Sequence, residues 1–167
     1  MGIWFTGTVC SAIVAAEDFY TIDRLLAAST NPTFLKMVEH IGSTEVRELM
    51  RYLSSELNRL FFQWWNVAQL GLLTFALLAV GPLIRSRRVT WTLATMVGVV
   101  AFLMIALMPP IVTIGRSLDF VPRDPPPPGL RTFGLLHAAF SVITFINLIL
   151  GALVTVWTIK DLEDANE

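Results

Sequence analysis

The chain has 167 residues, of which 54% are hydrophobic and 15% are charged, and its net charge is −1. Soluble globular chains carry about 25% charged residues, so this composition is typical of a membrane protein, and the near-zero net charge gives no indication of a nucleic-acid partner. The length allows one small helical bundle without a separate soluble domain. The single Cys10 excludes an intrachain disulfide, and with only two histidines in the chain we predict no metal site.

Uncharged stretches define the predicted membrane spans. Residues 60–84, 89–115 and 132–159 contain no Lys, Arg, Asp or Glu, and each stretch exceeds the roughly 20 residues that a helix needs to cross a bilayer. A further apolar stretch opens the chain. We therefore predict an all-α fold, an integral membrane four-helix bundle that forms a single membrane domain over residues 1–167, with spans at about 3–26, 60–82, 90–109 and 133–159.

The first sixteen residues allow two interpretations. They are uncharged and end in Val14, Ala15 and Ala16, as a signal-peptidase site does. A secretory signal usually begins with a positively charged region, and the sequence has none here. We expect a retained first span, and a cleaved peptide remains the alternative.

The connection between the first two spans is predicted to be helical. Asn31 is a good N-cap, Pro32 suits the first helical position, and Gly42 is a common terminator. A second pattern, with apolar residues at steps of three and four, begins at Thr44, and no helix breaker follows before Val80. We predict a short extramembrane helix followed by one long helix whose first part projects from the bilayer, so that residues 32–59 form an extramembrane helical segment.

The remaining loops differ in character. Four consecutive prolines, Pro125–Pro128, lie within a predicted loop over residues 116–131, and Pro109-Pro110 is expected to kink or stop the third span. The loop between the second and third spans is short and basic. Its arginines are expected to contact anionic lipid headgroups, or to act only as a topology signal; they are Arg85, Arg87 and Arg88.

Four spans would place both termini and the basic loop on one face of the membrane, and both long loops on the other. The densest basic cluster lies in the shortest loop, and acidic residues follow the first span. Because basic residues are enriched on the cytoplasmic side, we expect both termini to be cytoplasmic.

Small and polar residues recur at helical spacing within the spans. Membrane helices associate through such residues, so we predict that they form packing faces, with a polar pathway through the protein as the alternative. No charged residue lies in the middle of the last three spans, which argues against a pump. The predicted packing residues are Gly7, Ser11, Ala15, Gly98, Ser141, Thr144, Asn147 and Gly151.

A second set of polar residues is expected at one mouth of the bundle. Ordinary hydrogen bonding between helix ends accounts for such a set, and binding of a metal ion, a haem edge or a lipid headgroup by it remains open. Within it His137 is the candidate cofactor ligand. We predict no catalytic residue, because no nucleophile has a basic partner placed by the sequence. The set comprises Glu17, Asp18, Glu56, Asn58, Arg59, Gln63, Asn66 and His137.

Short motifs carry a resemblance to a known family. The motifs are Trp4–Gly7 and the run Ser-Glu-Leu-Asn-Arg-Leu-Phe-Phe at residues 55–62, which is followed by Trp65 and Gln69. With them the chain resembles a family of uncharacterised four-span bacterial membrane proteins. In that family a first helix that contains Gly and Phe is followed by a second helix that begins with Glu-Leu-Asn-Arg. The resemblance implies a four-helix membrane fold and no assigned activity. The acidic pair Glu17-Asp18 and the proline loop depart from the pattern.

These observations favour a non-catalytic accessory or scaffold subunit of a larger membrane complex, in a bacterial inner membrane. The expected partners are the lipid bilayer and other membrane protein subunits. Two alternatives remain: a small carrier or permeation protein, and a redox subunit that binds a cofactor through His137. The sequence does not identify a cofactor.

Overall fold

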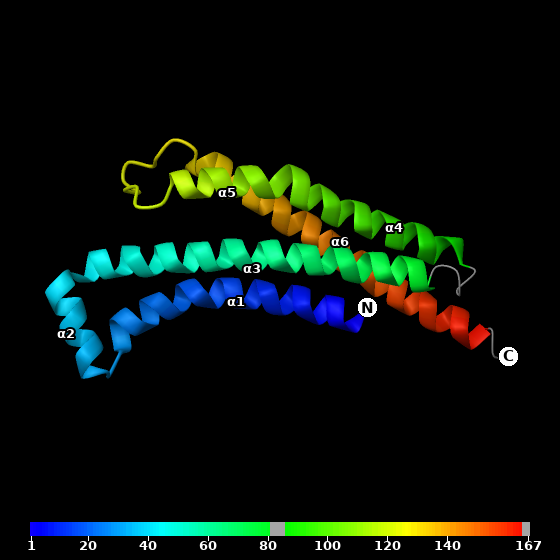
Figure 1. Ribbon diagram of the computed structural model, residues 1–167, viewed down its shortest axis with the longest axis horizontal. Helices are drawn as coiled ribbons and strands as arrows, with labels where there is room; N and C mark the ends of the chain where they lie inside the picture. The colour runs from blue at the N-terminus through cyan, green and yellow to red at the C-terminus, as the bar shows by residue number, and fades with distance from the viewer. Residues whose placement is uncertain (81–85, 165–167) are drawn as a thin grey trace.

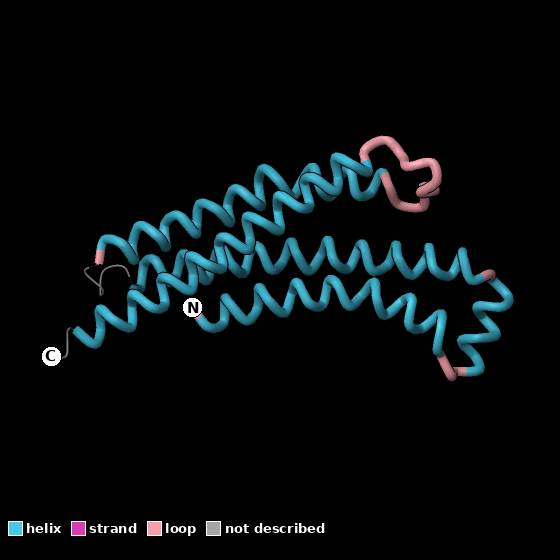
Figure 2. The backbone as a smooth tube through the Cα atoms, turned by 180° about the vertical axis from the view of Figure 1, so that it is seen from behind, coloured by secondary structure: helices cyan, strands magenta, loops and turns pink. Residues whose placement is uncertain are grey.

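The computed structural model describes residues 1–80 and 86–164, and within these ranges it contains helices and no strands (Figures 1 and 2). The elements in chain order are α1 (Gly2–Ala28), α2 (Pro32–Ile41), α3 (Ser43–Val80), α4 (Arg87–Phe102), the π-helical turn η1 (Leu103–Leu107), α5 (Met108–Ser117) and α6 (Leu130–Asp164).

The helices form an elongated bundle. In Figure 1, α1 lies along α3, and α4 and α5 lie along α6; contacts between α3 and α4 join the two groups. The short α2 and the proline loop lie at one end of the bundle, and both chain termini lie at the other (Figures 1 and 2). The axes of the two groups separate toward the α2 end.

The predicted caps explain how α2 is placed. The side-chain oxygen of Asn31 accepts hydrogen bonds from the backbone N–H groups of Thr33, at 3.0 Å, and Phe34, at 3.1 Å. At the other end Gly42 has φ of 106°, which a residue with a side chain rarely adopts. The chain therefore turns at Gly42 directly into α3, which is continuous over its 38 residues, as the sequence predicts.

The two prolines do not stop the third long helix. The predicted span ended at Pro109, whereas the helix continues through Pro110 to Ser117. The helix widens to π-helical geometry over Leu103–Leu107, immediately before the prolines. A π-helical turn changes the hydrogen-bond partners of the preceding carbonyl groups, and so accommodates two residues that lack an N–H group.

The last helix is also longer than predicted, because it continues to Asp164. The predicted span ended at residue 159. Arg88, at the start of α4, donates to the Asp161 carboxylate at 2.6 Å. This contact holds the end of α6 against α4.

The buried core lies in the half of the bundle that holds the termini. It joins α1, α3, α4 and α6, and its members are Trp4, Leu73, Val89, Leu93, Met96, Val100 and Val154. The half nearer α2 has fewer buried apolar residues. Packing is therefore tight where the termini lie and looser where the axes separate.

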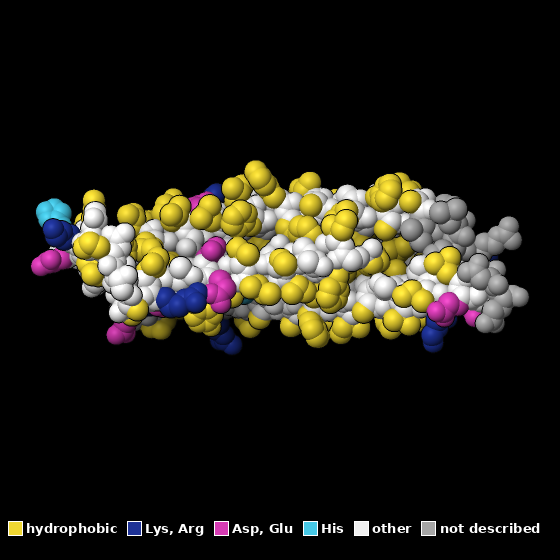
Figure 3. All heavy atoms as spheres, turned by 90° about the horizontal axis from the view of Figure 1, so that it is seen from below, with side chains coloured by type: hydrophobic (Ala, Val, Ile, Leu, Met, Phe, Trp, Pro, Cys, Tyr) yellow, Lys and Arg dark blue, Asp and Glu magenta, His cyan; other side chains and the backbone are white. Residues whose placement is uncertain are grey.

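Three helical stretches are long and apolar enough to cross a membrane: Ser43–Ala79, Arg87–Ser117 and Leu130–Asp164. Large apolar side chains on them are exposed, with Phe75 at 71% and Trp91 at 71%. In the face shown in Figure 3, charged side chains lie toward the two ends and an apolar band lies between them. A surface of this kind fits a lipid environment, and the chain has the features of an integral membrane protein.

Candidate functional site

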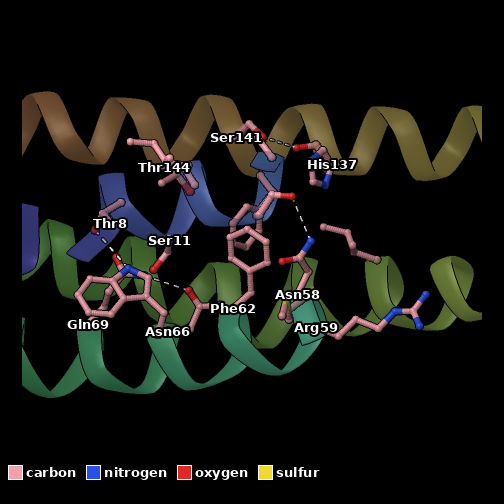
Figure 4. A pocket seen from close by; sticks show the side chains of 18 of the residues that line it. Thr8, Ser11, Asn58, Arg59, Phe62, Asn66, Gln69, His137, Ser141 and Thr144 are labelled. Atoms are coloured by element: carbon pink, nitrogen blue, oxygen red, sulfur yellow. Dashed lines mark hydrogen bonds between the residues drawn. The ribbon is translucent and has the colours of Figure 1, made fainter. Parts of the chain in front are cut away.

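A cleft of about 780 Å³ lies between α1, α3, α5 and α6. Its walls are mostly apolar, with contributions from Phe62 on α3 and Phe140 on α6, whose rings meet edge to face at 6.2 Å between centroids. Figure 4 shows polar residues of α3 facing polar residues of α6 across this space. α1 packs on α3, and α6 packs on α4 and α5, so the cleft lies between these two groups of helices.

Two glycine contacts lie at the end of the cleft that is nearer the chain termini. A Cβ atom on Gly7 would lie 2.0 Å from Cη2 of Trp65, and one on Gly151 would lie 2.4 Å from Cζ3 of Trp4. Both distances are far below van der Waals contact, so only glycine fits at these positions without movement of the indole. Trp65 thus sits against α1, and Trp4 sits against α6.

Buried hydrogen bonds join α1 to α3 at the same depth. The indole N–H of Trp4 donates to Oε1 of Gln69 at 3.1 Å, and Nε2 of Gln69 donates to Oδ1 of Asn66 at 3.1 Å. Nearby, the indole N–H of Trp65 donates to the hydroxyl oxygen of Thr8 at 3.3 Å (Figure 4). These bonds position one polar wall of the cleft.

Two asparagines of that wall have unpaired atoms. Asn66 is 1% exposed, and its Nδ2 has no hydrogen-bond partner in the described part of the chain. Nδ2 of Asn58 donates to the backbone oxygen of Ala15 at 3.2 Å, and its Oδ1 has no partner among the same residues. A buried amide group without a partner costs about 1–3 kcal/mol.

An ion-pair network borders the other end of the cleft. Arg59 donates to both carboxylate oxygens of Asp119, at 2.9 and 3.0 Å, and to Oε1 of Glu56 at 2.6 Å. Arg116 donates to both oxygens of Glu56, at 3.1 and 3.2 Å. Two arginines and two carboxylates thus balance each other, and they tie the end of α5 to α3. The ring of Phe120, in the same turn as Asp119, packs on Tyr52 of α3 with centroids 4.9 Å apart.

The structure brings together part of the predicted polar mouth. Asn58, Arg59, Asn66 and His137 line the cleft, and Glu56 is joined to them through Arg59. The imidazole of His137 stacks on the Phe133 ring, with centroids 5.9 Å apart. The remaining members of the predicted polar mouth do not line the cleft. They are Glu17, which pairs with Arg24 on the surface; Asp18, whose Oδ2 is buried without a described partner; and Gln63, which is exposed.

The predicted packing residues divide into three groups. Gly7 and Gly151 make close helix contacts, as described above. Ser11, Ala15, Ser141 and Thr144 line the cleft. Two others lie apart from it: Asn147 is 1% exposed with an unpaired Oδ1, and Gly98 is exposed on α4.

The predicted headgroup arginines are only partly described. Arg85 lies outside the described residues, and Arg87 is exposed. The guanidinium of Arg88 pairs with Asp161 and lies 5.5 Å from the centroid of the Trp157 ring. One of the three therefore makes contacts within the protein.

No family model, curated protein or solved structure matches the chain. Among the described residues no group of three or more His, Cys, Asp or Glu side chains is placed to hold a metal ion.

Sequence reasoning missed several residues of this region, among them Thr8, Gln69 and Asp119. Gln69 lies three residues after Asn66 within an uncharged stretch, and two amides at helical spacing there indicate a shared buried polar face. The pairing of Asp119 with Arg59 had no such signal, because the two residues are 60 positions apart.

Proposed function

We propose that this chain is an integral membrane protein that crosses the bilayer four times, with α1 as the first span. α1 has 27 residues, which at 1.5 Å each gives a length of about 40 Å, more than the roughly 30 Å of a hydrocarbon core. It is uncharged as far as Ala16 and lies along α3. The position of both termini at one end of the bundle (Figure 2) supports an even number of crossings.

The proposed setting is a bacterial inner membrane with both termini in the cytoplasm. The basic loop at residues 85–88 supports this orientation, because short basic loops are retained on the cytoplasmic side. In this arrangement the cleft lies in the half of the bilayer nearer α2, and it opens sideways into lipid. A molecule dissolved in the membrane would enter it without passing through water.

The function that the geometry supports best is binding of an amphipathic molecule in this cleft, as a small carrier or lipid-binding protein would do. The observation that carries the proposal is a mostly apolar cleft of about 780 Å³ that is also lined by a few polar groups, the hydroxyls of Ser11 and Ser141 and the imidazole of His137. Ligand sites are typically clefts of about 300–1,000 Å³ with apolar walls and a few placed polar groups. The cleft has both properties.

Filling the cleft is expected to displace the bound molecule. Ala12 lines the cleft on α1, and Ala12→Trp would place an indole in it. Ala152→Trp is the matched control, because Ala152 is exposed on α6 and outside the cleft. After purification in mild detergent, organic extraction and mass spectrometry should find a molecule with the wild type and the control that is lost from Ala12→Trp. No bound molecule, or equal amounts in all three proteins, would refute the proposal.

A second candidate is the non-catalytic accessory or scaffold subunit predicted from the sequence. What favours it is the exposed Gly98 of α4, where an added Cβ would meet no atom within 4 Å, so that the helix backbone is open to a helix of another protein at this point. We expect Gly98→Leu to abolish co-purification of a partner from native membranes while leaving the thermal stability of the isolated chain unchanged. If the same proteins co-purify with the variant, or none co-purify with the wild type, this candidate fails.

A further inference from the structure

One face of α3 is apolar, exposed and turned away from the bundle. Figure 1 shows α1 and α4 on either side of α3 and α6 behind it, so one side of α3 is left uncovered. Exposed apolar residues follow one another there at steps of four and three, which keeps them within an arc of about 80°. This arc lies opposite the residues of α3 that line the cleft. We call it the α3 stripe, and its members are Leu53, Leu57, Leu60, Trp64, Val67 and Gly71.

The α3 stripe extends into the part of α3 that projects from the bilayer in the four-span arrangement. Beyond the ion-pair network, toward α2, Leu49 and Leu53 are 60% and 59% exposed. The charged residues of the same turns lie on another side of the helix, because Arg47 and Arg51 both pair with Asp23 of α1. Lipid covers an apolar surface only within the bilayer, and an apolar patch that faces water typically marks a contact with protein.

The size and neutrality of the stripe suit a second copy of this chain. Leu49 continues it at one end, and Phe75 and Leu78 continue it at the other. With about 200 Å² for an aromatic side chain and on the order of 100 Å² for an aliphatic one, its exposed apolar surface is roughly 600 Å². A typical stable interface buries roughly 800 Å² per partner. The stripe contains no charged residue, so two copies of it do not repel each other.

We infer that two copies of this chain pair in parallel along their α3 stripes, around a two-fold axis normal to the membrane. Copies inserted in one membrane share one orientation, so equivalent residues meet at the same depth. Pairing removes Leu49 and Leu53 from water, which drives association. Within lipid, Gly71 lets the two backbones approach closely, since an added Cβ there would meet no atom of its own chain within 4 Å.

The dimer leaves the cleft open, because the stripe and the cleft lie on opposite faces of α3. The inference therefore rests on the four-span arrangement and is independent of the ligand proposed for the cleft. The comparison of Ala12→Trp with its control tests the cleft alone, so either proposal can fail without the other.

Disulfide formation between equivalent positions tests the pairing in native membranes. With Cys10 replaced by serine, Leu53→Cys should give a band at twice the mass of the chain after oxidation with copper phenanthroline, since paired Cα atoms come within the roughly 4–7 Å that a disulfide spans. Glu48→Cys is the matched control: Glu48 is exposed in the neighbouring turn, but it lies well outside the arc of the stripe. It should form no such band. No band from Leu53→Cys, or equal bands from both variants, would overturn the inference.

A second test depends on charge instead of cysteine chemistry. In the double variant Leu49→Glu, Leu53→Glu, carboxylates of the two copies would face each other in the dimer. Like charges in contact cost several kcal/mol, so the dissociation constant of the dimer in detergent should rise at least about a hundredfold. Tyr20→Glu is the control and should dimerise as the wild type does, because Tyr20 is exposed on α1 and lies outside the stripe.

Analytical ultracentrifugation of the full chain measures these constants. All the substituted side chains are exposed, so the variants should keep the thermal stability of the isolated chain. A wild type that stays monomeric at every concentration would overturn the inference, and so would a double variant that dimerises as tightly as the wild type.

Discussion

Gly7→Ala is expected to lower the free energy of unfolding by about 1–3 kcal/mol, the usual cost of overpacking a well-packed site. The added methyl would lie 2.0 Å from the Trp65 ring, so the indole has to move. That movement breaks its hydrogen bond to Thr8 and separates α1 from α3. A loss of 2 kcal/mol corresponds to a fall in the unfolding midpoint of roughly 4–8 °C for a chain of this size.

Gly98→Ala provides the matched control for this effect. Gly98 is also a helix-interior glycine, and no atom lies within 4 Å of its added Cβ. Alanine favours a helix over glycine by up to about 1 kcal/mol, so this variant should be as stable as the wild type or slightly more stable. Thermal unfolding of the two variants in the same detergent decides the matter: equal midpoints would show that Gly7 is not a contact point between α1 and α3.

Arg59→Met is expected to cost about 3 kcal/mol, because it leaves the Asp119 carboxylate without its bidentate partner. The side chains of Arg59 and Asp119 are only 14% and 15% exposed, so water replaces the lost bonds poorly. Glu56 keeps its contacts with Arg116 and is less affected. The turn that carries Asp119 should therefore detach from α3 and open the end of the cleft.

A second substitution and a surface control test this reasoning. The double variant Arg59→Met, Asp119→Leu should recover most of the loss, since it removes the unpaired carboxylate. Arg24→Met breaks an exposed pair with Glu17, with side chains 66% and 53% exposed, and surface pairs contribute about 0–1 kcal/mol. If Arg59→Met and Arg24→Met have the same unfolding midpoint, the ion-pair network does not stabilise the contact between α3 and the end of α5.

The helices themselves were largely predictable, because their signals are local. Asn31 and Gly42 mark the ends of α2, and the absence of breakers before Val80 indicates a long α3. The continuation through Pro109-Pro110 was not predictable in this way. It depends on a change of backbone geometry over Leu103–Leu107, just before the prolines, and the side chains of that segment give no sequence signal for it.

The cleft could be predicted only in part. Asn58, Arg59, Asn66 and His137 share one side of the membrane in a four-span topology, and the structure places all four on the cleft wall. Its existence, however, depends on the separation of the helix groups, which is set by contacts between residues far apart in the chain. The small-residue pattern of α1 illustrates the limit: steps of four place Gly7 against Trp65, but place Ser11 and Ala15 at an open space.

A cleft that opens into lipid, and the four-span arrangement itself, both require α1 to cross the membrane. With Cys10 replaced by serine, single cysteines at Gly2, Ser86 and Ser117 can be labelled from either side of sealed membranes with a membrane-impermeant thiol reagent. We predict that positions 2 and 86 react from the cytoplasmic side and position 117 from the opposite side. Labelling of position 2 from the same side as position 117 would mean that α1 does not cross, and would contradict the four-span arrangement.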